Sequence, residues 1–318
     1  MTGPRSMSQT SNKIAIQNRT QEGIISTLAF FAIYDLPLTV ERVWQLLYRA
    51  EATLSQVQAE LIHLARSGAI VGASGLYALK PWNQDKYDRN QEEIGKRWQR
   101  VERYRRLLSL IPFVETIAVI NSMAMGNADS ESDIDFFVIT KPKRLYFVRT
   151  LVILLFKILG VYKTRERINQ QFCFGFYLSS ERLSLGWLVL PGEDPYLAHW
   201  MATILPLFGQ KTYERFLKEN KWLYLSFPNF RSQQRLGRLK EKRPLKRLKR
   251  FIEIVLWLPA VVLEPLLRWV HVGHTFRLPE NSWPTSSTVA NKWVVKLHAL
   301  DPRKDLRKKY YEILQNLK

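Results

Sequence analysis

Two aspartates, Asp133 and Asp135, stand two residues apart where an apolar run ending at Ile139 begins. Because side chains alternate along a β-strand, both carboxylates are predicted to face the same side. Ile134 and Phe136 then point to the opposite face, and the unbroken apolar run indicates a strand covered on both sides. Carboxylates are the hard oxygen ligands that Mg²⁺ requires, so the pair predicts a divalent-cation site at the start of this strand.

The segment upstream of the aspartates is suited to holding phosphates. Residues 114–120 predict a strand, and Ser122 follows at the expected start of a short helix. A small residue with free backbone N–H groups at a helix start can bind phosphate oxygens, which a metal ion held by carboxylates then bridges. Residues 120–139 together therefore predict a site for a metal-bound nucleotide.

Three groups of residues resemble a known signature: Asn121-Ser122, Gly126 and Ser132-Asp133-Ile134-Asp135. They are similar to the Gly-Ser, spacer, Asp-hydrophobic-Asp motif of the DNA polymerase β-like nucleotidyltransferase superfamily, in its minimal-nucleotidyltransferase branch. The flanking sequence from Pro37 to Asn229 looks like a group of uncharacterised bacterial nucleotidyltransferase-domain proteins.

The resemblance implies a role for each matching position. Asp133 and Asp135 would ligate the catalytic metal, Mg²⁺ or Mn²⁺. The nucleotide and its phosphates would be held by the four other positions: Asn121, Ser122, Gly126 and Ser132. The implied reaction moves a nucleoside monophosphate from a nucleoside triphosphate, with ATP as the expected donor, to a hydroxyl or phosphate of an acceptor that the sequence does not identify.

The chain departs from the superfamily pattern at two places. Asn121 replaces the usual Gly, a mild change because Asn tolerates left-handed backbone. Active members carry a third carboxylate on a neighbouring strand, but the expected strand, residues 172–178, contains no acid, and Glu166 and Glu181 only flank it. Cys173 in that strand is interpreted as a buried, inert thiol. Two hypotheses therefore stay open: a nucleotidyltransferase, and a weak or inactive protein that binds nucleotide or nucleic acid.

Composition limits the protein class. The 318-residue chain is 46% hydrophobic and carries a formal net charge of +20, which favours globular structure and anionic partners. A single Cys excludes an internal disulfide framework and fits a reducing compartment. Residues 1–20 lack the apolar core of a signal peptide, so we expect a cytoplasmic protein.

Two apolar runs, residues 145–162 and 251–272, are interrupted by charged side chains, so we expect buried helices and no transmembrane segment. The basic segment 231–250 precedes the second run. It is interpreted as a solvated amphipathic helix, with binding to nucleic acid or to an anionic membrane surface as the alternative. Peripheral membrane attachment through residues 231–272 is therefore one expectation.

The sequence predicts an α/β (α+β) nucleotidyltransferase core with an N-terminal winged-helix-like domain and a helical C-terminal region. The expected segments are a loose N-terminus (1–20), a winged helix-turn-helix-like domain (21–82), a connecting helix (83–110), the core (111–190) and the helical region (191–318). The third helix of the winged domain carries a single Arg, Arg66, which favours packing over DNA binding. The arginines of the connecting helix are interpreted as solvated.

Overall fold

A computed structural model describes residues 16–230, 243–282, 286–297 and 300–317. The chain has a mixed α/β structure that divides into two compact units. The first combines Met1–Trp82 with Tyr224–Phe230 and Lys304–Lys318, and the second combines Asn83–Leu223 with Arg231–Arg303. Residues 191–318 are divided between the two units, so the expectation that they form one region is wrong.

The first unit contains the helices and the hairpin that the sequence predicted. Residues 19–78 contribute α1 (Arg19–Ala32), β1 (Leu38–Thr39), α2 (Val40–Gln45), α3 (Leu54–Arg66), β2 (Val71–Ala73) and β3 (Leu76–Ala78) to it. The strands form an antiparallel sheet in the order β1-β3-β2. Residues 1–15 of the expected loose segment 1–20 lie outside the described residues. Helix α1 already begins at Arg19. The Asn18 side chain caps it by accepting a hydrogen bond from the Gln21 N–H.

Polar residues of α3 act within the first unit. The helix begins with a capping box of Thr53 and Gln56. The Glu60 carboxylate accepts hydrogen bonds of 2.8 Å from the side chains of Asn18 and Gln21. This use of Glu60 agrees with a packing role for α3.

The second unit is built on a six-stranded mixed sheet with the order β7-β4-β5-β6-β9-β8. Its strands are β4 (Val114–Val119), β5 (Ile134–Thr140), β6 (Phe172–Ser179), β7 (Leu205–Phe208), β8 (Val289–Ala290) and β9 (Val294–Lys296). Strands β5 and β6 are parallel and are joined by α6 (Leu145–Ile158), as the strand-helix-strand pattern predicted. The other neighbouring strands pair antiparallel.

The expected helical C-terminal region also contains strands. Strands β7, β8 and β9 come from this region and extend both edges of the core sheet. Helix α7 (Pro195–Thr203) is followed by β7, and residues 294–296 form β9 where a helical region was expected. Val294 and Val295 are β-branched and buried against β6, which explains the extended backbone. The region does supply α8 (Gln210–Glu219), α9 (Trp222–Ser226), α10 (Arg243–Val255), α11 (Trp257–Arg277), α12 (Pro279–Ser282) and α13 (Arg303–Gln315).

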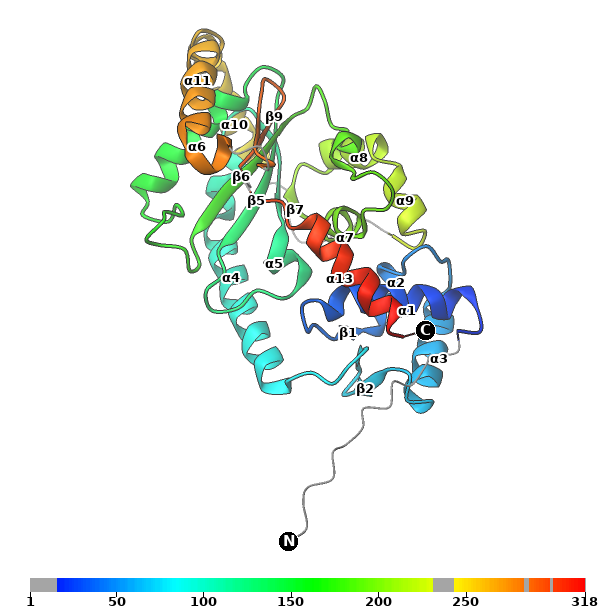
Figure 1. Ribbon diagram of the computed structural model, residues 1–318. Helices are drawn as coiled ribbons and strands as arrows, with labels where there is room; N and C mark the ends of the chain where they lie inside the picture. The colour runs from blue at the N-terminus through cyan, green and yellow to red at the C-terminus, as the bar shows by residue number, and fades with distance from the viewer. Residues whose placement is uncertain (1–15, 231–242, 283–285, 298–299, 318) are drawn as a thin grey trace. The chain divides into compact units, whose positions relative to one another are not determined.

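Helices cover both faces of strand β5 (Figure 1). Phe136 and Val138 lie in the core that includes residues of α6 and of the long helix α4 (Gln84–Leu110). Phe137 points to the other face, where its ring contacts Trp200 of α7 and Phe216 of α8. All seven residues of β5 are buried, which confirms the strand covered on both sides. Asp135 and Phe137 are two residues apart on β5, so their side chains point to the same face of the sheet. The Asp135 carboxylate therefore lies on the side of α7.

Helix α11 packs against α6 through one narrow stripe of side chains. The Glu264 carboxylate accepts from the backbone N–H groups of Tyr146 and Phe147 at 3.0 and 2.8 Å, which satisfies the first turn of α6. The outer side of α10 and α11 is exposed, so the expectation of a buried helix over 251–272 is wrong for that face. Among the described residues, no helix combines the length and apolarity needed to span a membrane.

His271 on α11 is held as a neutral imidazole. Its Nδ1 accepts from Arg149 Nε at 3.3 Å, which leaves Nε2–H to donate to Thr150 Oγ1 at 2.8 Å. Burial, with the nearby positive charges of Arg149 and His274, lowers the pKa of His271 from 6.5 to about 4. The neutral imidazole therefore makes its full contribution to the free energy of unfolding above pH 6.5. This contribution is lost as the pH falls towards 4.

We expect the free energy of unfolding of the wild type to fall by about 2 kcal/mol more between pH 7 and pH 4.5 than that of His271→Gln. The reason is that Gln keeps one donor and one acceptor but does not titrate. Urea unfolding of both proteins at the two pH values measures the difference. Parallel losses in the two proteins would contradict the neutral assignment.

Candidate metal and nucleotide site

The two predicted metal ligands lie at the beginning of β5. Asp133 immediately precedes the strand and Asp135 is its second residue. Asp135 is 8% exposed, whereas the Asp133 side chain is more accessible. The pair is therefore anchored at one end by the buried strand and opens towards solvent at the other.

Asn121 joins the turn after β4 to this pair. Its backbone is left-handed, with φ of 57°, the conformation that a Gly at this position would adopt most easily. Its side-chain Nδ2 donates to Asp135 Oδ2 at 2.9 Å, and its Oδ1 accepts from Trp200 Nε1 at 2.8 Å. Asn121 therefore shapes the turn and fixes the orientation of the Asp135 carboxylate.

The other predicted phosphate-binding residues occupy two different settings. Ser122 lies in the first turn of α5 (Asn121–Met125), and its carbonyl accepts from the N–H groups of Gly126 and Asn127, both at 2.9 Å. Gly126 ends this helix with φ of 93°. The Ser132 hydroxyl donates to Asp129 Oδ1 at 2.7 Å. Asn121 is thus hydrogen-bonded to the acid pair, while Ser132 stabilises the loop that precedes Asp133.

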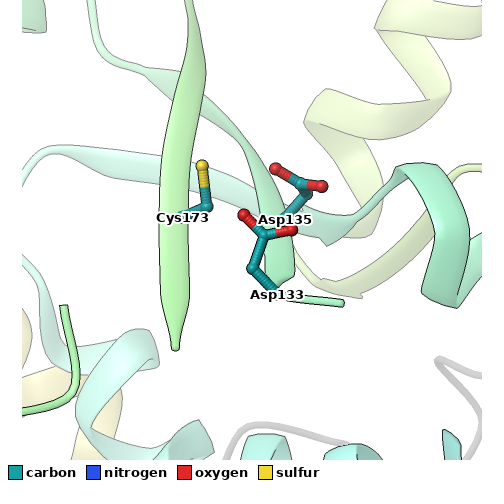
Figure 2. Close-up of side chains that lie close together, drawn as sticks. All are labelled: Asp133, Asp135 and Cys173. Carbon is teal, nitrogen blue, oxygen red and sulfur yellow. The ribbon is translucent and has the colours of Figure 1, made fainter. Parts of the chain in front are cut away.

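Cys173 lies on the strand on which a third carboxylate was expected. In the parallel pairing of β5 with β6, Cys173 is directly opposite Asp135. Its Sγ and one oxygen from each of Asp133 and Asp135 lie within 4.8 Å of one another, and Figure 2 shows the three side chains gathered from the two strands. The interpretation of Cys173 as a buried, inert thiol did not include this grouping, because the grouping depends on the register between two strands.

The two glutamates that flank β6 lie outside this grouping. Glu166 is exposed in the loop that precedes β6. Glu181 lies two residues beyond the other end of the strand and accepts from Ser179 Oγ at 3.2 Å. At about 3.3 Å per residue, the stretch of β6 from Cys173 to Ser179 alone spans about 20 Å, and Glu181 follows it. Neither glutamate therefore takes the place of the third acid.

The electrostatics of the site follow from two acids and a thiol at close range. Burial, and then the charge of Asp133, raise the pKa of Asp135 to about 6, although the Asn121 hydrogen bond opposes the shift. Burial, and then the charges of Asp135 and Asp133, raise the pKa of Cys173 well above its usual value. Cys173 is thus a neutral thiol at neutral pH and does not act as a proton acceptor there.

Lys163 supplies a positive charge to the pair. Its Nζ lies 2.6 Å from Asp133 Oδ2, and the lysine side chain is 37% exposed. Burial opposes the charged form, but the neighbouring acidic groups, Asp133 and Asp135 among them, outweigh it and raise the pKa of Lys163. Sequence analysis missed this residue, because it lies in the loop between α6 and β6 and no local pattern links it to Asp133.

Arg97 of α4 holds the loop that leads into Asp133. The sequence interpretation of a solvated arginine is wrong at this position, since the Arg97 side chain is completely buried. Its guanidinium donates to the carbonyls of Ser130, at 3.2 Å, and Ser132, at 2.8 Å, and to Asn169 Oδ1 at 3.3 Å. It also pairs with Glu93 on its own helix. A charged helix can bury one such residue when backbone carbonyls of a loop satisfy its donors.

Arg97→Met is expected to lower the free energy of unfolding by about 3 to 5 kcal/mol, because it leaves buried carbonyl groups without donors. Chemical denaturation measures this loss. Arg106→Met, at an exposed position of the same helix, serves as the matched control and should change stability by about 0.5 kcal/mol or less. Equal effects of the two substitutions would contradict the structural role of Arg97.

A cavity of about 200 Å³ adjoins Asn121 on the α7 side of the sheet. Its lining includes the rings of Tyr196 and Trp200 and the charged side chains of Lys296 and Arg303. Trp200 stacks on Phe176 with ring centroids 5.7 Å apart. Burial lowers the pKa of Lys296 to about 8. Asp301 also lines the cavity and pairs with Arg303 at 2.6 Å. The cavity therefore offers aromatic surface beside Asn121, with the charge of Arg303 balanced by Asp301.

The comparisons with known proteins give no assignment: no family model, no curated protein and no solved structure matches the chain.

Proposed function

We propose that the chain is a divalent-cation-dependent nucleotidyltransferase whose core has the DNA polymerase β-like fold. The observation that carries the proposal is the contact between the turn and the acid pair: Asn121, at left-handed φ beside Ser122, donates to Asp135 on the next strand. The strand, turn, short helix and second strand of residues 114–140 follow the order that the resemblance implies. The helices α1, α2 and α3 and the antiparallel sheet of the first unit support a winged-helix-like domain.

The acid pair fits one hard divalent cation. Asp133 and Asp135 offer carboxylate oxygens from a single strand, which are the donors that Mg²⁺ and Mn²⁺ prefer. Cys173 offers a neutral sulfur, a poor donor for Mg²⁺, so the residues present do not complete a second oxygen-rich site. When bound, the ion would neutralise phosphate charge. Lys163, already paired with Asp133, supplies further positive charge for the triphosphate.

The proposed reaction transfers a nucleoside monophosphate from ATP or another nucleoside triphosphate. An oxygen of the acceptor attacks the α-phosphorus, the bond from that phosphorus to the bridging oxygen breaks, and pyrophosphate leaves. A hydroxyl acceptor must also lose a proton, whereas a phosphate acceptor is already ionised. The chain's own residues position the reactants: Asn121 orients Asp135, and Arg97 fixes the loop before Asp133.

A second candidate function is binding of nucleotide without turnover, and Cys173 is the observation that favours it. The position opposite Asp135 carries a protonated thiol, so the group expected to activate an acceptor hydroxyl is missing. Nucleic-acid binding through α3 has less support, since Glu60 of that helix is engaged with Asn18 and Gln21. Residues 231–242 of the basic segment, which was the alternative candidate for such binding, lie outside the described residues.

One experiment separates the two candidates. The full chain is incubated with Mg²⁺ and ATP labelled at the α-phosphate, together with a mixture of hydroxyl and phosphate acceptors. Label that appears in an acceptor, with release of pyrophosphate, supports the transferase. Metal-dependent retention of ATP without transfer supports the binding protein. If the chain neither retains nor converts ATP in the presence of Mg²⁺ or Mn²⁺, both candidates are wrong.

A further inference from the structure

An apolar surface covers the outer side of α10 and α11 in the second unit. Phe251, Ile254 and Val255 of α10 are between 58% and 66% exposed. On α11 the large apolar side chains that are at least half exposed are Trp257, Leu258, Val262, Leu266 and Trp269. Such a continuous array is unusual on a monomeric protein and indicates an interaction surface.

The opposite side of α11 is used to attach the helix to the core. Ala260 is completely buried, Glu264 caps α6, and His271 contacts Thr150. These positions recur at helical spacing, so they form one face and leave Leu258, Val262 and Leu266 on another. The exposed side chains therefore project from a helix that is already fixed in place, and folding of the unit does not bury them.

Helix α10 is fixed in a similar way and brings basic residues to the rim of this surface. Lys249 Nζ donates to the Val114 carbonyl at 2.6 Å, and the Glu253 carboxylate accepts from the Phe113 N–H at 2.8 Å. These contacts hold the inner face on the edge of β4. Arg247 and Arg250 of the same helix are exposed beside Phe251 and Ile254.

A groove of about 550 Å³ adjoins the apolar surface and carries positive charge. Its lining includes Lys141, Arg144 and Arg250 together with Trp257 of the apolar surface. Glu253 also lines it and pairs with Lys141 at 2.5 Å, so Arg144 and Arg250 supply the excess charge. A membrane interface has two layers, acyl chains and phosphate headgroups. The apolar side chains are suited to contact the acyl chains, and the cationic groove beside them is suited to bind the phosphates.

We propose that the outer face of α10 and α11 docks on an anionic phospholipid membrane, with lipid phosphates in the groove of Arg144 and Arg250. The charge of this rim favours a lipid surface over a second copy of the chain, whose own net charge is +20. The proposal is independent of the nucleotide site, because none of the residues of that site lies on this face.

Vesicle sedimentation of the full chain tests the proposal. At low ionic strength the wild type is expected to co-sediment with vesicles containing phosphatidylglycerol and to remain in the supernatant with pure phosphatidylcholine. Trp257→Ser combined with Trp269→Ser should lower the partition coefficient about tenfold or more. Arg144→Gln combined with Arg250→Gln should lower it about 25-fold, at roughly fivefold for each charge.

Leu225→Ser is the matched control, because this side chain is 79% exposed and lies in the other unit. It should bind vesicles like the wild type. The proposal is overturned if the wild type does not bind anionic vesicles, or if the tryptophan variant binds them as well as the wild type. It is also overturned if size-exclusion chromatography shows a wild-type dimer that the tryptophan variant converts to a monomer, since the face would then belong to a second copy.

Discussion

Replacing both acids, in Asp133→Asn with Asp135→Asn, is expected to reduce the metal-dependent affinity for ATP by about 100-fold or more. The two carboxylates are the grouped oxygen donors that the structure offers to a hard cation, and each loses its charge in this variant. Asn at position 135 can still accept the hydrogen bond from Asn121, so the turn should keep its shape. Isothermal titration with a non-hydrolysable ATP analogue, with and without Mn²⁺, measures the change.

Glu131→Gln provides the matched control for this variant. Glu131 is an exposed acid in the loop just before Asp133 and does not belong to the group of Asp133, Asp135 and Cys173. Its replacement removes one negative charge from the same region and should leave the affinity within about twofold, as expected for a screened surface charge. If both variants lose affinity equally, general charge and not the acid pair governs binding.

The second large effect is expected from Cys173→Asp. A carboxylate opposite Asp135 would restore the third acid of the resemblance, and positioned proton transfer contributes about 10² to 10⁴ in rate. We therefore expect transfer to a hydroxyl acceptor to rise by about 100-fold. The melting temperature should also increase more on addition of Mn²⁺ than in the wild type, because a third oxygen ligand tightens metal binding.

Cys173→Ser separates this effect from the loss of the thiol. Serine has nearly the same size as cysteine and supplies no base, so its transfer rate should stay close to that of the wild type. If the Asp and Ser variants transfer at the same rate, the position opposite Asp135 has no part in activating the acceptor. If the Asp variant gains metal affinity but not rate, the chain is a nucleotide-binding protein.

The sequence predicted the parts of this site that depend on local patterns. Apolar runs located β5 and β6, and the alternation of side chains placed the carboxylates of Asp133 and Asp135 on one face. The tolerance of Asn for left-handed backbone anticipated the φ of Asn121. Each of these predictions needed only a residue type and its immediate neighbours.

The remaining features depend on contacts between distant segments. Cys173 faces Asp135 only because β5 and β6 pair in one particular register, and Lys163 reaches Asp133 from a loop about 30 residues away in the sequence. Arg97 is buried because loop carbonyls surround it, which a charged helix does not reveal. Strand β9 was missed because its three residues form a strand by pairing with β6 and β8, which a short sequence does not reveal.

The most direct test of the acid-pair site is a crystal structure of the chain soaked with Mn²⁺ and a non-hydrolysable ATP analogue. The account predicts an anomalous peak about 2.1 Å from carboxylate oxygens of both Asp133 and Asp135, with the phosphates beside Asn121 and Ser122. Manganese and nucleotide bound elsewhere, with Lys163 still paired to Asp133 across an ion-free site, would contradict it.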